Sequence, residues 1–348
     1  MPSSRGASRR PSVDDPLRHP LRHHGDVEVG DLLDLAVNVY AGPRPPWLDA
    51  ALRASLSEVG AYPSSDRARA AVATLHGRPT DEVVVTAGAA EAFTLVARLR
   101  PWRKAVVVHP QFTEPHAALK QAGHQVCEVV LASPFTLDPA AVPDDADLVV
   151  VGNPTNPTGV LHPAAAIRAL LRPGRTVVVD EAFMDCVPGE PESLVRDRHD
   201  GLVVLRSLTK HWSIPGIRAG YLTGDPATVA ALAAGQVPWS VSTTAAAAVE
   251  ACCTPEAAEE SRRRAEEIAD WRKQLEAGLD ELGVRFLEST ASFVLARVGN
   301  GVHARLRERG VAVRRADTFP GLDGSWVRIA VRPPETTERF LEELRALG

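Results

Sequence analysis

Residues 207–218 read SLTKHWSIPGIR, and they contain the lysine on which the interpretation of this sequence depends. The chain has 348 residues and 39 Lys plus Arg, yet its lysines are only four: Lys104, Lys120, Lys210 and Lys273. Arginine serves equally well as a surface charge, whereas only lysine forms an imine with a carbonyl compound. Lys210 lies between an apolar run and a Pro-Gly turn, so it is the candidate reactive residue.

Short apolar runs surround this segment and predict the fold. They are EVVVTAG (82–88), KAVVVHP (104–110), DLVVVGNP (147–154), RTVVVDEA (175–182), GLVVLRS (201–207) and AGYLTG (219–224). Runs of valine without polar alternation indicate strands that are buried on both faces of a mostly parallel sheet. Segments of helix length separate them, so the sequence predicts an α/β fold.

The character of the sequence changes after about residue 236, where a long charged helical stretch leads into an α+β pattern. We therefore predict a large domain followed by a smaller one. The predicted divisions are a flexible tail (1–20), an N-terminal arm that joins the small domain and covers the substrate (21–46), a large domain (47–235) and a small C-terminal domain (236–348).

Composition narrows the classes of function. The net charge of -5, without basic runs, argues against a nucleic-acid partner. No apolar stretch reaches the length of a membrane span, and the N-terminus lacks a signal-peptide pattern, so we expect a cytoplasmic protein without a membrane partner. The four cysteines show no CxxC spacing, and we expect no metal site.

Polar residues follow several of the predicted strands, at the edge where parallel sheets bind ligands. Gly88-Ala89-Ala90-Glu91 is a small-residue turn that opens a helix, whose free N–H groups suit a phosphate, although taken alone a plain strand-to-helix turn explains it better. Residues 153–159, NPTNPTG, form either a rigid turn or a loop that holds the Asn156 amide toward a ring oxygen.

Asp180 follows the apolar residues of the run at 175–179, and a buried acid needs a positive or hydrogen-bonding partner. A helix N-cap is one explanation; a pyridinium nitrogen, which a buried carboxylate keeps protonated, is the other. Ser207, Thr209 and Arg218 surround Lys210 in sequence, and two hydroxyls with a guanidinium suit a phosphate dianion.

Taken in order, TAGAAE, NPTNPTG, VVDEAF and SLTKHWSIPGIRAGY resemble the cofactor framework of the fold-type I pyridoxal-phosphate (PLP) enzymes, the class I/II aminotransferase superfamily, over about residues 20–348. The resemblance implies an aspartate-aminotransferase-like fold and PLP as cofactor. It implies Lys210 as the Schiff-base lysine, Asp180 facing the pyridine nitrogen, Asn156 near the ring hydroxyl and Phe112 stacked on the ring. Around the cofactor phosphate it implies Ala89, Ala90, Ser207, Thr209 and Arg218, together with Tyr62 from the neighbouring subunit of a homodimer.

Two relatives within the superfamily compete. Phe183 in DEAF, PWSV (238–241) and FPGLD (319–323) resemble threonine-phosphate decarboxylase, whereas histidinol-phosphate aminotransferases usually carry Tyr in place of Phe183. The first resemblance implies a lyase that decarboxylates L-threonine O-3-phosphate to (R)-1-aminopropan-2-yl phosphate for cobalamin biosynthesis. It also implies a set of substrate residues: His23, Asn38, Asn156, Arg314 and Arg328.

The alternative is an aminotransferase for a phosphorylated amino compound such as histidinol phosphate, and a third is a non-catalytic binding protein of the same fold. His24, Asp26 and Tyr40-Ala41 depart from the decarboxylase pattern, and the segment 26–33 is shorter than in that family. The cofactor-phosphate turn, with Ala89 and Ala90, reads AGAAE in place of GNG. An intact set of cofactor residues favours an enzyme. The sequence predicts the decarboxylase, because its likeness extends beyond the cofactor residues.

Overall fold

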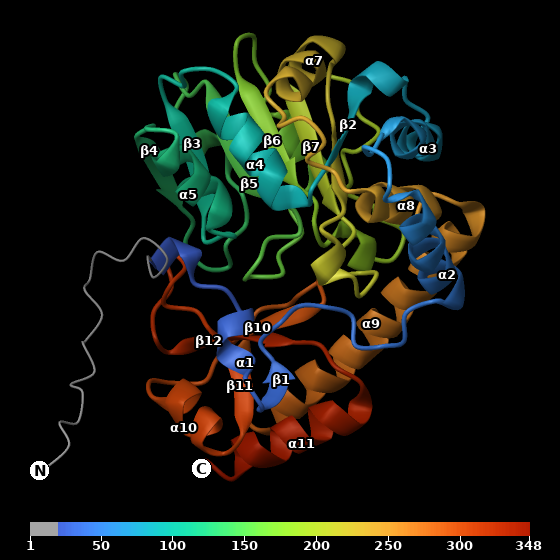
Figure 1. Cartoon of the computed structure of the whole chain (residues 1–348). Helices are drawn as coiled ribbons and strands as arrows, with labels where there is room; N and C mark the ends of the chain where they lie inside the picture. Colours follow the sequence, from blue (N-terminus) through green and yellow to red (C-terminus); the bar gives the residue numbers. More distant parts are fainter. Residues whose placement is uncertain (1–19) are drawn as a thin grey trace, which may run out of the picture.

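The computed structural model describes residues 20–348, so the predicted tail lies outside the described residues except for Pro20. Two sheets organise the chain, a large one in the upper half of Figure 1 and a smaller one below it. The large sheet contains, in spatial order, β2 (Val83–Thr86), β8 (Gly220–Thr223), β7 (Leu202–Ser207), β6 (Thr176–Asp180), β5 (Leu148–Gly152), β3 (Ala105–His109) and β4 (Val126–Val130).

The large sheet is mostly parallel, as the valine-rich runs predicted. The neighbours from β7 through β6, β5 and β3 to β4 are all parallel, whereas β8 is antiparallel to both β7 and β2. Successive side chains of a strand point to opposite faces, and here both faces are covered. Val106, Val149 and Val177 belong to one apolar core, whereas Val107 and Val178 belong to another. Burial on both faces explains why these strands lack polar alternation.

Helices cover the two faces of the large sheet (Figure 1). In the large-sheet half they are α2 (Pro46–Ser55), α3 (Asp66–His76), α4 (Ala89–Arg98), α5 (Glu114–Gln121), α6 (Ala164–Arg168), α7 (Pro226–Ala234) and α8 (Thr243–Ala251). Single 3-10 turns are η2 (Pro20–Arg22), η3 (Leu56–Glu58), η4 (Thr80–Glu82), η5 (Pro139–Ala141), η6 (Met184–Cys186) and η7 (Pro215–Ile217).

The small sheet combines the N-terminal arm with the C-terminal part of the chain. Its order is β1 (Leu33–Leu35), β11 (Val311–Arg315), β12 (Trp326–Ala330), β10 (Phe293–Arg297) and β9 (Arg285–Phe286). The helices of this half are α1 (Asp26–Val29), α9 (Pro255–Glu281), α10 (Val302–Glu308) and α11 (Pro334–Arg345). No helix within residues 20–348 is long and apolar enough to span a membrane.

The arm reaches both halves of the molecule. Strand β1 pairs in parallel with β11, so Leu33 lies opposite Val311. A few residues later, the Tyr40 backbone N–H donates to the Lys210 carbonyl oxygen at 3.0 Å. The arm therefore joins the edge of the small sheet to the turn that carries the candidate reactive lysine.

Candidate active site

The carboxyl ends of β6 and β7 bring Asp180 and Lys210 together, as parallel topology requires. Asp180 is the last residue of β6 and is buried, and its carboxylate accepts a hydrogen bond from the Ala182 N–H at 3.1 Å. Burial raises the pKa of Asp180, whereas the positive charge of Lys210 lowers it. A buried acid here is thus balanced by a cation in the turn after the neighbouring strand, and a protonated ring nitrogen would balance it equally well.

The side chain of Lys210 lies over the turn that follows β7. Its Nζ donates to Ser207 Oγ at 3.2 Å and lies 5.7 Å from the centre of the Phe183 ring. Burial lowers the pKa of Lys210 to about 8; Asp180 opposes this shift, and the charges of Arg218 and Arg328 add to it. The unprotonated amine, which is the form that attacks a carbonyl, is therefore more abundant near neutral pH than for an ordinary lysine.

A phosphate would fit the turn between β2 and α4. Ala89 and Ala90 are the first two residues of α4, so their N–H groups lack partners within the helix and point toward its N-terminal end. A Cβ on Gly88 would lie only 2.7 Å from Arg218 Nη2, so glycine permits the guanidinium to approach this turn. Arg218 itself has a φ of 59°, and its Nη1 donates to the Pro215 carbonyl oxygen at 3.0 Å.

Two hydroxyls complete the same cradle. Ser207 Oγ and Thr209 Oγ1 lie 2.9 Å apart, and both side chains are buried. Helix N–H groups, two hydroxyls and a guanidinium form the donor set that a phosphate dianion requires. The residues present thus fit PLP: a cradle for its phosphate, an acid for its ring nitrogen and a lysine for its aldehyde.

Asn156 and Arg328 meet beside this cluster, although Asn156 lies in the turn after β5 of the large sheet and Arg328 lies on β12 of the small sheet. Arg328 Nη1 donates to Asn156 Oδ1 at 2.6 Å, and its Nη2 donates to the Ala36 carbonyl oxygen at 2.5 Å. The Nε of this buried guanidinium has no acceptor among the described residues. A desolvated cation with an unused donor is a binding group for a carboxylate or a phosphate.

Asn38 is the second buried residue with unused polar atoms. Neither its amide nitrogen nor its amide oxygen has a hydrogen-bond partner within residues 20–348. It lies on the arm between β1 and Tyr40, whose backbone is bonded to the Lys210 turn. Leaving a buried amide without partners costs about 1–3 kcal/mol, so this position is suited to a polar ligand group.

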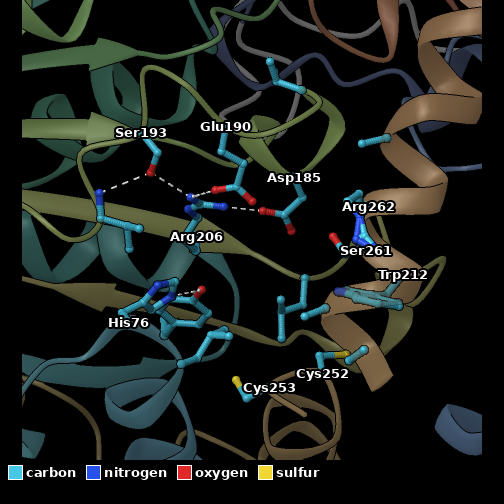
Figure 2. A pocket seen from close by; sticks show the side chains of 18 of the residues that line it. His76, Asp185, Glu190, Ser193, Arg206, Trp212, Cys252, Cys253, Ser261 and Arg262 are labelled. Carbon is cyan, nitrogen blue, oxygen red and sulfur yellow. Dashed lines mark hydrogen bonds and ion pairs between the residues drawn. The ribbon is translucent and has the colours of Figure 1, made fainter. Parts of the chain in front are cut away.

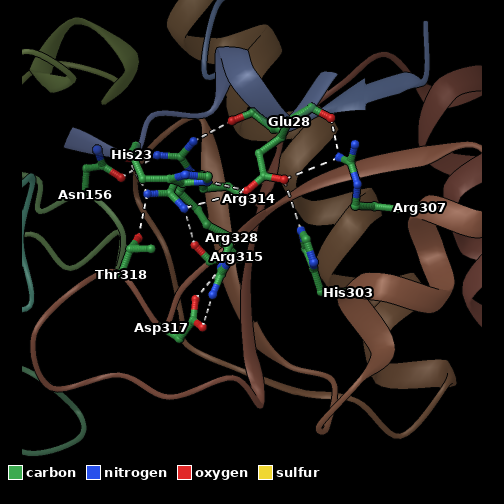
Figure 3. Close-up of polar contacts among 11 residues, drawn as sticks. His23, Glu28, Asn156, His303, Arg307, Arg314, Arg315, Asp317, Thr318 and Arg328 are labelled. Carbon is green, nitrogen blue, oxygen red and sulfur yellow. Dashed lines mark hydrogen bonds and ion pairs between the residues drawn. The ribbon is translucent and has the colours of Figure 1, made fainter. Parts of the chain in front are cut away.

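His23 and Arg314 differ from Arg328, because both are engaged within the protein (Figure 3). The Arg314 guanidinium donates to the His23 carbonyl oxygen and to Thr318 Oγ1, both at 2.7 Å, and to the Arg315 carbonyl oxygen at 2.6 Å. His23 Nε2 is hydrogen bonded to Glu28 Oε1 at 2.7 Å. These two residues hold the arm against the small sheet.

The two predicted aromatic residues lie in different surroundings. Phe112 is half-buried and packs obliquely against Phe93, with ring centroids 6.2 Å apart. Tyr62 is 77% exposed on the connection between η3 and α3, where it stacks on Trp239 with centroids 4.4 Å apart.

Sequence reasoning missed two residues that shape the site. Arg332 Nη2 donates to Asp34 Oδ2 at 3.1 Å and to the Val37 carbonyl oxygen at 2.6 Å, which secures the arm beside Asn38. Glu28 is buried in α1 among basic side chains. Apart from His23, the partners of Glu28 lie almost 300 positions away in sequence, as do those of Arg332 on the arm, so no local pattern marks these contacts. The repeated VRIAVR spacing, which places Arg332 four residues after Arg328, was the one available signal.

A cavity of about 490 Å³ lies behind the Lys210 turn and contains a buried charge network (Figure 2). Arg206 on β7 forms ion pairs with Glu181, at 2.9 Å, and with Asp185 and Glu190, and its Nη2 donates to Ser193 Oγ at 2.9 Å. Burial raises the pKa of Glu181 to about 7 and that of Asp185 to about 6, although Arg206 lowers both. The Arg206 guanidinium thus forms ion pairs with three carboxylates directly behind Ser207.

Comparison with known proteins agrees with this geometry. Residues 30–344 match the family model for aminotransferase class I and II. The chain is 49% identical to a histidinol-phosphate aminotransferase of Mycobacterium tuberculosis, over 90% of this chain and 87% of that protein. It is 30% identical to the threonine-phosphate decarboxylase of Salmonella typhimurium, over 92% of each. The crystal structure of the histidinol-phosphate aminotransferase from Clostridium acetobutylicum superposes with a TM-score of 0.83 at 26% identity, covering 91% of this chain and 99% of that one.

The chain therefore belongs to the class I and II aminotransferase family of PLP-dependent enzymes, and its fold is that of aspartate aminotransferase. The predicted family, fold class and cofactor are confirmed. The choice of reaction is not: the mycobacterial aminotransferase is far more similar to this chain than the decarboxylase is, so the similarities favour the alternative over the predicted lyase.

Proposed function

We propose that this protein is a PLP-dependent aminotransferase that moves an amino group from a phosphorylated amino compound, histidinol phosphate, to a 2-oxo acid. The observation that carries the proposal is Arg328, a buried guanidinium with an unused Nε beside Asn156, suited to the anionic end of a substrate. The 49% identity to a mycobacterial enzyme named for this reaction supports the choice of substrate. A cytoplasmic location belongs to the same proposal.

The bound cofactor supplies an electron-withdrawing ring that accepts the electron pair of a bond broken at the substrate Cα. Asp180 would hold the proton of the ring nitrogen, and the Asn156 amide nitrogen would face the ring hydroxyl while its oxygen accepts from Arg328. Ala89, Ala90, Ser207, Thr209 and Arg218 would hold the phosphate. Lys210, whose pKa is lowered to about 8, would carry the cofactor through its amine and, when that amine is free, would move the proton of the substrate Cα.

The choice of bond follows from how the substrate is held. The bond that stands perpendicular to the ring overlaps its π system and breaks most easily, so positioning selects the reaction. Arg328 holds the anionic group of the substrate, and Asn38 offers the amide contacts that remain. We propose that together they keep the Cα–H bond perpendicular to the ring, within reach of Lys210.

Decarboxylation of L-threonine O-3-phosphate is the second candidate, with a role in cobalamin biosynthesis. Phe183 favours it, since histidinol-phosphate aminotransferases usually carry Tyr at this place, and so does the 30% identity to the Salmonella enzyme. In this candidate His23, Arg314 and Arg328 together would bind a carboxylate and a phosphate.

One pair of incubations separates the two candidates. Holoenzyme given histidinol phosphate and a 2-oxo acid is expected to form the corresponding amino acid, and without the 2-oxo acid to stop after converting its cofactor to the amine form. Holoenzyme given threonine phosphate alone is expected to release little CO2. Mass spectrometry of the products provides the measurement. Sustained CO2 release without any 2-oxo acid would establish the decarboxylase instead.

We also propose that the enzyme is a homodimer in which Tyr62 reaches the cofactor phosphate of the partner subunit. An apolar surface supports this proposal, because Leu56, Val59, Tyr62, Val237 and Trp239 are all exposed, at 60%, 58%, 77%, 66% and 60%. Tyr62 and Trp239 stack on each other within this surface. Large exposed apolar patches mark interaction sites, and symmetric pairing is the common form of oligomer.

Leu56→Asp is expected to weaken the dimer by about 100-fold or more, because it places a charge in an apolar contact at little cost to the isolated fold. Light scattering across a concentration series measures the change, and turnover should fall with the dimer fraction. Val130→Asp on the edge strand β4 is the matched control, since Val130 is also exposed, at 51%. An active monomer of the unaltered protein would contradict the proposal.

A further inference from the structure

The turn that carries Lys210 is bonded to the N-terminal arm at two points. The Tyr40 N–H donates to the Lys210 carbonyl oxygen at 3.0 Å, and Ser213 Oγ donates to the Tyr40 carbonyl oxygen at 2.7 Å. The first bond runs from the arm to the turn and the second from the turn to the arm, so together they fix the two segments relative to each other. The position of the Lys210 backbone therefore depends on where Tyr40 lies.

The side chain of Tyr40 is anchored to helix α9. Its ring stacks on Trp271, with ring centroids 5.6 Å apart and an interplanar angle of 6°, and the Arg264 guanidinium carbon lies 4.3 Å from the ring centre. The phenolic hydroxyl donates to the Glu267 carboxylate. A guanidinium over an aromatic face is a favourable contact, the more so where water is excluded. Three residues of α9 thus determine where Tyr40 lies.

Arg264 also contacts the Lys210 turn directly. Its side chain is completely buried, and its Nη1 donates to the carbonyl oxygen of His211, the residue after Lys210, at 2.7 Å. Its Nη2 donates to the Pro43 carbonyl oxygen on the arm at 2.8 Å, and its Nε to Glu260 at 2.8 Å. One guanidinium therefore joins the turn, the arm and α9.

The His211 side chain provides a second contact between the turn and α9. The ring is buried, with Nε2 hydrogen bonded to Ser261 Oγ at 3.0 Å and Nδ1 lying 3.8 Å from Cys186 Sγ. Burial lowers the pKa of His211 to about 3, and the charge of Arg264 adds to this shift. The imidazole is therefore neutral near pH 7, so this contact stays the same across the neutral pH range.

Helix α9 is itself fixed to both halves of the molecule, along which it extends (Figure 1). Ala257, near its start, packs in an apolar core of the large sheet, whereas Leu275 and Leu279 pack in the core of the small sheet. Arg264 lies between these points and carries that rigidity to the Lys210 turn. A displacement of about 1 Å at a reacting group can cost about 100-fold in rate, so such support matters for the chemistry.

From this geometry we infer that Arg264 is a positioning residue, which fixes the backbone of Lys210 through the His211 carbonyl group and through Tyr40. The inference rests on the proposed function, in which Lys210 moves the proton of the substrate Cα. It adds to that function a residue of α9 that acts on the rate through the turn rather than by binding the substrate.

The test is Arg264→Met, which keeps much of the side-chain volume and removes the donors. In this variant kcat is expected to fall by about 30-fold or more, a larger factor than any rise in the KM of the donor, because Arg328 is unaltered. Arg264→Lys retains the charge and one donor group, so it should recover part of the loss. A raised KM with an unchanged kcat would show that Arg264 only holds the arm in place, and would overturn the inference.

A spectroscopic measurement on the holoenzyme does not depend on turnover. The visible circular dichroism of the bound cofactor reports whether its link to Lys210 is held in one orientation. Arg264→Met is expected to lose about half of this signal or more per bound cofactor. Arg175→Met is the matched control, because Arg175 is also buried and donates to the Ala146 and Leu170 carbonyl oxygens at the amino end of β6, the opposite edge of the sheet. The control should keep both the signal and kcat.

A smaller substitution serves if Arg264→Met does not fold. Ser213→Ala removes one bond between the turn and Tyr40 and is expected to lower kcat by about threefold or more, together with the circular dichroism. An unchanged signal in every variant that folds would overturn the inference, even if histidinol phosphate is a good substrate. A reduced signal, with no turnover of histidinol phosphate by the unaltered holoenzyme, would overturn the proposed function and leave the inference standing.

Discussion

Lys210→Ala is expected to reduce turnover by about 10⁴-fold or more, because it removes both the nucleophile and the group that moves the Cα proton. The structure supplies the reason for the size of the effect. Lys210 is partly buried and interacts electrostatically with Asp180, and the other lysines of the chain cannot take its place from their own positions. Steady-state kinetics with the donor and 2-oxo acid chosen above measures the loss.

Borohydride reduction gives an independent measurement on the same variant. It should attach the cofactor to the peptide that contains Lys210 in the unaltered protein, and to no peptide in Lys210→Ala. Lys104→Ala is the control, since Lys104 forms only a surface pair with Asp145 at 2.7 Å. A label on Lys104, Lys120 or Lys273 would show that the reactive lysine has been misassigned.

Arg206→Leu is expected to lower the free energy of unfolding by about 3–5 kcal/mol, the usual result of removing one partner from a buried ion pair. Arg206 is the cation shared by Glu181, Asp185 and Glu190, and its own side chain and that of Glu181 are almost inaccessible to solvent. Urea unfolding measures the change. Arg309→Leu removes an exposed arginine pair and should cost no more than about 1 kcal/mol; a similarly small loss for Arg206→Leu would mean that the network contributes little.

The same network predicts a dependence of stability on pH. The pKa of Glu181 is raised from 4.5 to about 7 and that of Asp185 from 3.8 to about 6 in the folded protein. Between about pH 4 and 7 the folded state therefore binds more protons than the unfolded state, so these two groups make stability fall as pH rises through that range. The deficit of Arg206→Leu should accordingly be larger at pH 8 than at pH 5.

The position of three candidate cofactor elements, Asp180, Lys210 and the turn at Ala89 and Ala90, was predictable because each lies at or just after the end of a strand. Asp180, Lys210 and the turn at Ala89 and Ala90 each come directly after an apolar run, and the parallel order of the strands gathers such positions at one edge. The order of strands and polar residues in the sequence was therefore enough to predict that these residues lie close together. The antiparallel β8 was the exception, although the connection from Ser207 to Gly220 contains no α-helix to carry a parallel crossover.

The substrate side could not be predicted in the same way. Whether Arg314 is free or engaged depends on Glu28 and His23, which lie on an arm almost 300 residues earlier in the chain. A family resemblance predicts which type of residue occupies a position. It does not predict which neighbouring groups neutralise the charge of that residue. The sequence predicts the same role for Arg314 and Arg328, the binding of an anionic group of the substrate. Their surroundings differ, because Arg314 is bonded within the protein whereas Arg328 keeps an unused Nε.

The pairing of β1 with β11 also constrains the order in which this site can be completed during synthesis. Leu33–Leu35 is synthesised long before its partners Val311–Val313, which follow far later in the chain. Until then the arm has no neighbour in the small sheet, and Asn38 cannot be held beside Lys210 by that pairing. Contacts between such distant segments form slowly because a long loop must close first. The nascent chain is therefore expected to gain a folded large sheet before it can bind substrate, and a chain that stops before residue 311 should never do so.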